Sequence, residues 1–172
     1  MTSKTTSTGV QVFHYLKRNP NLTRDQFWAY WQDIHGPKLV PLAENYGFLR
    51  YQQFRTFGKV LPVSSPEAAP NVADVGLKDT PSEPVDFDGI AMFLFPSLDS
   101  FKAAVEDQYY LNVVEPDEHN LMDKSAPGRG VVASFQGSMI PVVQDGADAT
   151  GDELRVEVKK ARKAFAEING AT

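Results

Sequence analysis

Three histidines and a short acidic run are the residues of this chain best suited to proton transfer. The histidines are His14, His35 and His119, and the last of them directly follows two acids. Histidine changes its charge near neutral pH, which suits it to general acid–base catalysis. Burial of a carboxylate beside a cavity would raise its pKa enough to hold or deliver a proton, and among these acids we favour Asp117. The predicted catalytic residues are His35, His14 and Asp117.

Each of these residues also has a structural interpretation. His35 precedes Gly36-Pro37 at an expected helix end, where the helix dipole favours imidazolium but where a side chain can also cap the helix. Asp117 follows Pro116, so it could be an ordinary acid in the first turn of a helix. His14 lies in an expected strand and could be a packing residue, and the sequence leaves open which face of that strand meets a pocket.

Aromatic side chains are concentrated near the predicted sheet, where they could form the walls of a pocket for a flat, polyphenolic ligand. Many of them would simply belong to the core. Trp31 and Tyr51 carry polar groups that could orient a phenol or enolate oxygen. The predicted substrate-binding residues are Trp31, Tyr51, Phe54, Tyr15, Phe93 and Tyr110.

Composition limits the classes of function. The 172 residues carry a net charge of -5 and include no cysteine, which excludes disulfides and thiol chemistry. With three histidines there are few zinc ligands, so we expect no metal and no cofactor. The acidic balance argues against nucleic acid as a partner, and no apolar run is long enough to cross a membrane. We expect a soluble, intracellular, cytoplasmic protein of one domain.

The first half of the chain has the pattern strand, helix, strand. Residues 10–16 are rich in β-branched and aromatic side chains and predict a strand after a disordered tail at 1–9. Thr23 and Gln26 form a capping box before an amphipathic helix that we expect to end at Gly36-Pro37. A weaker helix at 38–45 and a strand at 48–57 follow.

The second half repeats this order after residues 58–84, whose five prolines predict a long surface loop that could serve as a lid. Residues 85–95 predict a buried strand, and Ser97 or Asp99 can cap the next helix. A strand is expected at 131–143. A last helix at 152–168, with a capping box at Thr150 and Glu153, would pack its apolar stripe on another surface.

Two β-α-β halves fold most simply as an α+β domain of the ferredoxin-like type, a four-stranded antiparallel sheet with the helices on one face. The opposite face must then be covered. We expect a second copy to cover it, which gives a homodimer and a pocket in each domain. The predicted domain spans residues 10–143, and residues 144–172 hold the C-terminal helix.

Three segments resemble the sequence motifs of EthD-domain proteins, which have the dimeric α+β barrel fold. Residues 27–37 read FWAYWQDIHGP and resemble the pattern F-x-x-Y-W-x-x-x-H-x-P; residues 51–54 (YQQF) and 110–123 (YLNVVEPDEHNLMD) are similar to two later segments. The resemblance spans about residues 10 to 143.

The chain most resembles the fungal EthD proteins of aromatic polyketide pathways. The resemblance implies a cofactor-free tailoring enzyme acting on a small aromatic polyketide, most simply a lyase that decarboxylates an anthrone-type carboxylic acid. A polyketide cyclase or dehydratase of the same fold is the first alternative. A protein that binds an aromatic metabolite without chemistry is the second.

Overall fold

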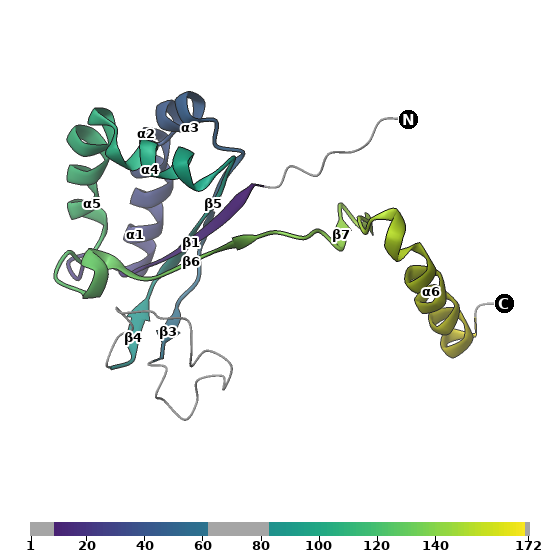
Figure 1. The fold of residues 1–172 in the computed structure, drawn as a ribbon. Coiled ribbons are helices and arrows are strands. Elements are labelled where there is room, and N and C mark those ends of the chain that lie inside the picture. Colours follow the sequence, from purple (N-terminus) through teal and green to yellow (C-terminus); the bar gives the residue numbers. More distant parts are fainter. Residues whose placement is uncertain (1–8, 62–82, 171–172) are drawn as a thin grey trace. The chain divides into compact units, whose positions relative to one another are not determined.

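The computed structural model describes residues 9–61 and 83–170, which belong to two compact units, Met1–Ser138 and Met139–Thr172. The expected tail falls almost entirely outside the described residues, as does most of the expected proline-rich loop. Figure 1 shows the helices and strands of each unit.

The first unit is built on a four-stranded antiparallel sheet. Its strands are β1 (Val10–Leu16), β2 (Arg50–Phe54), β5 (Gly89–Phe95) and β6 (Val131–Ser138), in the order β2-β5-β1-β6. β1 and β5 are the central strands, and each comes from the start of one β-α-β half. This order confirms the ferredoxin-like α+β fold predicted from the sequence.

Helical segments connect the strands in both halves. The first half contains α1 (Arg24–Tyr30), η1 (Trp31–His35), α2 (Gly36–Lys38) and α3 (Val40–Tyr46); the second contains α4 (Leu98–Glu106), η3 (Tyr110–Val114), α5 (Glu115–Leu121) and η4 (Pro127–Gly130). The predicted capping box is confirmed, because the Thr23 side chain accepts a hydrogen bond from the Gln26 backbone N–H and the Gln26 side chain accepts one from the Thr23 backbone N–H. Ser97 caps α4.

The helices differ from the predicted ones in that each half contains a wide π-helical turn. η1 and η3 are each followed, after one residue, by a proline, Pro37 and Pro116. Proline lacks an N–H and clashes with the carbonyl four residues earlier in a regular α-helix, and a wider turn relieves both problems. The helix therefore continues through Gly36-Pro37, where the sequence predicted its end.

The helices pack against one face of the sheet. Along β1, Val12, His14 and Leu16 share this face, because side chains alternate along a strand. The buried core comprises Leu16, Phe27, Trp31, Ala91, Leu121 and Met122 in one cluster and Leu39, Leu42 and Val114 in a second. The second cluster lies between the helices of the two halves, so it fixes their relative positions.

The expected 58–84 loop is partly wrong, because Gly58–Val60 forms strand β3. This strand pairs with β4 (Val85–Phe87) ahead of the first proline of the segment, Pro62, so no proline interrupts the ladder. Asp88 then separates β4 from β5, where one expected strand splits into two. Its buried carboxylate forms ion pairs with Arg18 and Arg24.

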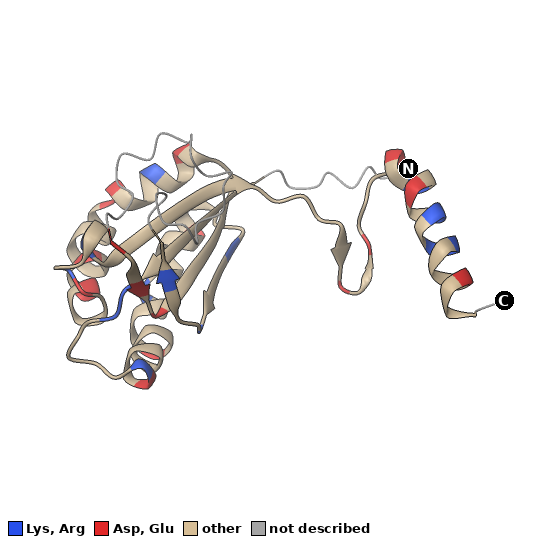
Figure 2. Cartoon of the chain, turned by 90° about the horizontal axis from the view of Figure 1, so that it is seen from below, with Lys and Arg blue, Asp and Glu red and all other residues tan. Residues whose placement is uncertain are grey.

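The second unit contains β7 (Val143–Gln144), β8 (Ala147–Asp148), η5 (Asp152–Leu154) and α6 (Arg155–Asn169). The expected strand at 131–143 is too long, since β6 ends at Ser138. The expected capping box is also wrong, because the Thr150 hydroxyl hydrogen bonds to Asp148. Acidic and basic residues are interspersed along α6 (Figure 2).

Most apolar side chains of α6 are exposed within the described residues, with Phe165 at 69% and Ile168 at 84% exposure, while Val158 is half-buried. The packing partner predicted for this helix is therefore not found in its own unit. No helix among the described residues is both long enough and apolar enough to span a membrane.

Candidate active site

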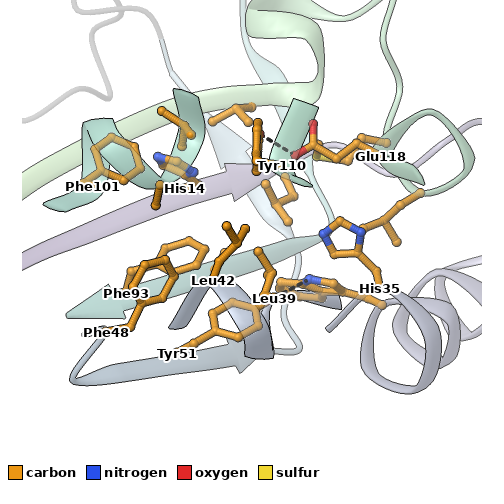
Figure 3. Close-up of a pocket in the computed structure, with 18 of the residues that line it drawn as sticks. His14, His35, Leu39, Leu42, Phe48, Tyr51, Phe93, Phe101, Tyr110 and Glu118 are labelled. Carbon is orange, nitrogen blue, oxygen red and sulfur yellow. Dashed lines mark hydrogen bonds between the residues drawn. The ribbon is translucent and has the colours of Figure 1, made fainter. Parts of the chain in front are cut away.

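A cavity of about 120 Å³ lies between the helix-covered face of the sheet and the helices of both halves (Figure 3). Its walls are mainly apolar and include Leu39, Leu42, Phe48, Phe93, Phe95 and Phe101. Cavities of roughly 150 Å³ hold a single benzene ring. The cavity in this conformation is therefore suited to one ring, and a larger ligand would have to widen it or extend beyond it.

His35 lines this cavity, and one nitrogen of its ring is bound to a carboxylate. The Nδ1 atom of His35 lies 2.9 Å from Oδ2 of Asp117, and both side chains are buried. His35 comes from η1 and Asp117 from α5, so each half of the fold supplies one partner. A carboxylate at Nδ1 favours the tautomer with its proton on that nitrogen, which leaves Nε2 free to act as a base.

Asp117 also accepts hydrogen bonds from Tyr30, at 2.6 Å, and from Lys38. Burial acts to raise the pKa of Asp117, but the hydrogen bonds from Lys38, Tyr30 and His35 outweigh it and lower the pKa to about 2. The sequence-based expectation of a raised pKa is thus wrong. Asp117 does not line the cavity, and it remains ionised, so it is placed to position His35 rather than to deliver a proton.

Tyr51 presents a hydrogen-bond donor to the cavity. Its hydroxyl oxygen accepts hydrogen bonds from Trp31 Nε1 at 3.0 Å and from Gln53 Nε2 at 3.1 Å. With both acceptor positions engaged, the hydroxyl proton is free to bond to a ligand oxygen. Burial raises the pKa of Tyr51 to about 12, although these hydrogen bonds act in the opposite direction, so the donor keeps its proton at neutral pH.

Glu118 is a cavity residue that sequence reasoning passed over in favour of its neighbour Asp117. Its side chain is 14% exposed and accepts hydrogen bonds from Tyr110 at 2.9 Å and Lys124 at 2.5 Å. Burial and the nearby Glu118 charge raise the pKa of Tyr110. The sequence signal for Glu118 is its spacing from Tyr110. The chain stays helical through Pro116, which brings Tyr110, Asp117 and Glu118 onto one continuous helical segment.

His14 lines the cavity beside Phe101, away from His35 (Figure 3). It makes edge-to-face contacts with Phe93 and Phe101, with ring centroids 5.7 and 6.0 Å apart. Burial lowers the pKa of His14 despite the opposing effect of Glu118, so the ring is neutral at neutral pH. A neutral imidazole can donate one hydrogen bond and accept another.

Of the predicted substrate-binding residues, Trp31, Tyr51, Phe93 and Tyr110 line the cavity. Tyr51 and Phe93 stack on one another, with ring centroids 4.7 Å apart. Phe54 and Tyr15 do not line it, and their placement at the pocket is wrong. Both project from the opposite face of the sheet, because each is an odd number of strand positions from a residue that faces the helices.

Potential metal ligands do not cluster in the part of the chain that the structure describes: no group of three or more His, Cys, Asp or Glu side chains is arranged to hold an ion. His119, the remaining histidine, is 51% exposed and lies near Glu115 on the surface. The polar groups available to a ligand in the cavity are thus side chains of histidine, tyrosine and glutamate.

Two fungal relatives are identical to this chain at about a quarter of the aligned positions. A protein named dehydratase ustZ, from Ustilaginoidea virens, is 26% identical over 106 residues, which cover 62% of this chain and 69% of the relative. A conidial pigment biosynthesis dehydratase, EthD of Metarhizium robertsii, is 25% identical over 108 residues, covering 63% and 70% of the two chains.

Similar solved structures include HapK from Hahella chejuensis, with a TM-score of 0.46 at 12% identity, covering 83% of this chain and 99% of that one. An EthD family protein from Bacillus halodurans has a TM-score of 0.36 at 12% identity, covering 77% and 99%. The family model for the EthD domain matches residues 19–125, a span that contains η1, η3 and α5 with the His35–Asp117 pair. The chain belongs to the EthD family.

Proposed function

We propose that the protein is a cofactor-independent dehydratase of aromatic polyketide biosynthesis, which eliminates water from a cyclic β-hydroxy ketone. The observation that carries this proposal is the His35–Asp117 pair at a mainly apolar cavity that also contains the Tyr51 hydroxyl. This set provides a base, a group that stabilises the base once protonated, and a donor for the oxygen on which negative charge develops.

The proposed reaction uses His35 twice. Nε2 first removes a proton from the carbon between the carbonyl and hydroxyl-bearing carbons, and the electron pair moves to the carbonyl oxygen, where Tyr51 donates a hydrogen bond. The imidazolium is stabilised by the Asp117 carboxylate, 2.9 Å away. It then returns the proton to the leaving β-hydroxyl group while the enolate collapses, so a carbon–carbon double bond forms and water departs.

The names of both fungal relatives, which are called dehydratases, support dehydration over decarboxylation and cyclisation. Decarboxylation remains the second candidate, because the Tyr51 donor could stabilise the enolate that forms as carbon dioxide leaves, and a protonated His35 could then deliver a proton to its carbon. Cyclisation would need the same base but a longer, open substrate.

Product analysis tests the proposal. The purified full chain is incubated with a β-hydroxycyclohexanone, and the products are followed by mass spectrometry. The proposal expects loss of water to give the conjugated ketone in wild type and not in His35→Ala. A wild-type protein that leaves such substrates unchanged, but releases carbon dioxide from a cyclic β-keto acid, would replace dehydration with decarboxylation.

We also propose that the protein acts as a homodimer joined through the sheet face opposite the cavity. The exposed aromatic residues of this face include Phe54 at 55% and Phe135 at 45% exposure, and Met92 lies between them on the central strand β5. A contiguous apolar face of this kind is typical of an interaction surface. A second copy would present the same face, as a two-fold interface requires.

A further inference from the structure

We propose that the cavity admits uncharged ring compounds and rejects carboxylates, and that Glu118 is the residue that sets this preference. The inference rests on the proposed function, because it defines the substrate class of the same site. It does not follow from that function, since an acid–base site of this type could equally act on an anionic substrate.

Glu118 brings a negative charge to the cavity wall. Its side chain lines the cavity and is 14% exposed, with Oε1 bound to the Tyr110 hydroxyl and Oε2 to Lys124. Lys124 lies outside the lining, so a ligand carboxylate in this small, mainly apolar space would lie nearer to the Glu118 carboxylate than to the ammonium group that pairs with it. Repulsion between charges is much stronger in such surroundings than in bulk water.

No opposite charge is available to compensate. Among the described residues that line the cavity, none is lysine or arginine. The two nearby ammonium groups lie outside the lining, and each already pairs with a carboxylate, Lys38 with Asp117 and Lys124 with Glu118. A positive charge on His35 would likewise be matched by Asp117. An entering carboxylate would lose its hydration and gain no new ion pair.

The remaining polar groups suit an uncharged ligand. Tyr51 offers one hydroxyl donor, because its oxygen already accepts from Trp31 and Gln53. His14 offers one donor and one acceptor, and no hydrogen bond to its ring is present among the described residues. Hydroxyl and ketone groups on a ring can satisfy such groups without bringing a charge into the cavity.

Benzamide and benzoate test this preference, because they have nearly the same shape and differ in charge at neutral pH. Binding to the full wild-type chain is measured by calorimetry and by the change in tryptophan fluorescence, since Trp31, one of the two tryptophans, lines the cavity. We expect benzamide to bind at least tenfold more tightly than benzoate. In Glu118→Gln, which keeps the shape of the side chain, the ratio should fall at least threefold.

Glu115→Gln is the matched control, since Glu115 lies on the same helix, pairs with Arg129 and does not line the cavity. Its ratio should equal that of wild type. Equal or tighter binding of benzoate by wild type, no detectable binding of either compound, or an unchanged ratio in a folded Glu118→Gln would each overturn the inference. The wild-type ratio needs no variant, so a Glu118→Gln chain that fails to fold leaves the test intact.

Binding and turnover separate the two proposals. A protein that prefers benzamide but leaves β-hydroxy ketones unchanged retains the charge preference and loses the proposed dehydratase function. A protein that dehydrates those ketones in a His35-dependent manner, yet binds benzoate as well as benzamide, keeps the function and loses the preference.

Discussion

His35 and Asp117 are separated by 82 residues in sequence, yet Nδ1 of the histidine lies 2.9 Å from Oδ2 of the carboxylate. They belong to different halves of the repeat and meet because η1 and α5 pack beside one another. Their contact leaves Nε2 of His35 free of this hydrogen bond, and His35 lines the cavity. Most of the predictions below depend on this relationship.

Asp117→Asn should lower kcat about 100-fold or more, because the amide cannot stabilise an imidazolium as a carboxylate does. KM should change little, since Asp117 does not line the cavity. Steady-state kinetics on the β-hydroxy ketone measures both constants. Asp123→Asn is a suitable control, because Asp123 contacts Ser125 at the surface. An Asp117→Asn enzyme with wild-type kcat would remove Asp117 from the mechanism.

Tyr51→Phe should lower kcat about 100-fold by removing the donor to the developing oxyanion. It should also reduce the free energy of unfolding by about 1–3 kcal/mol, because the N–H groups of Trp31 and Gln53 lose their shared acceptor. Kinetics and urea denaturation measure the two effects. Tyr46→Phe removes a hydroxyl that is bound to Asp107 and lies outside the cavity lining, so it should leave kcat unchanged. An equal loss of kcat in Tyr46→Phe would mean that the effect of Tyr51→Phe is not specific.

The pH dependence of stability should report the ionised state of Asp117. Its folded-state pKa of about 2 is below the ordinary value of 3.8, so ionisation favours the folded protein above pH 3.8, and this stability is lost as the pH falls through about 2. The difference corresponds to about 2 kcal/mol. Urea denaturation of wild type and Asp117→Asn should show their difference in unfolding free energy shrinking by about that amount between about pH 6 and about pH 2. A constant difference would contradict the lowered pKa.

Met92→Glu should convert the proposed dimer to a monomer, because it would place a carboxylate from each copy in the proposed apolar interface. Sedimentation of wild type should give twice the chain mass of 19.0 kDa. Ile34→Glu is the control, since Ile34 is 46% exposed on η1 and lies outside the sheet. A monomeric wild type would contradict the proposed dimer.

The sheet and its order could be predicted from the sequence because strand composition, prolines and capping residues all indicate the same β-α-β repeat. The path of the chain at Pro37 and Pro116 could not. Proline after a helical segment usually marks the end of a helix, and only the packing of the two halves shows that a π turn keeps each helix intact. For this reason the sequence predicts Asp117 as a catalytic acid but leaves open that it is an ordinary acid in the first turn of a helix.

The candidate site was predictable in its residue types and less so in their roles. His35, Trp31 and Tyr51 were predicted from their side-chain chemistry and lie in the segments that resemble EthD motifs. All three line the cavity. The direction in which the Asp117 pKa shifts could not be predicted, because it depends on Lys38 and Tyr30, which are distant in sequence. His14 and Tyr15 were both predicted at the site although they lie on opposite faces of β1, because strand alternation alone does not tell which face meets the helices; only His14 lines the cavity.

Hydrogen exchange at carbon tests most directly whether His35 is the base. Cyclohexanone, which has no hydroxyl to eliminate, is incubated in heavy water with wild type or with folded His35→Ala, and loss of its α-proton signal is followed by NMR. We predict that wild type exchanges these protons faster than the protein-free solution and that His35→Ala does not. Exchange by His35→Ala at the wild-type rate would contradict the assignment of His35 as the base.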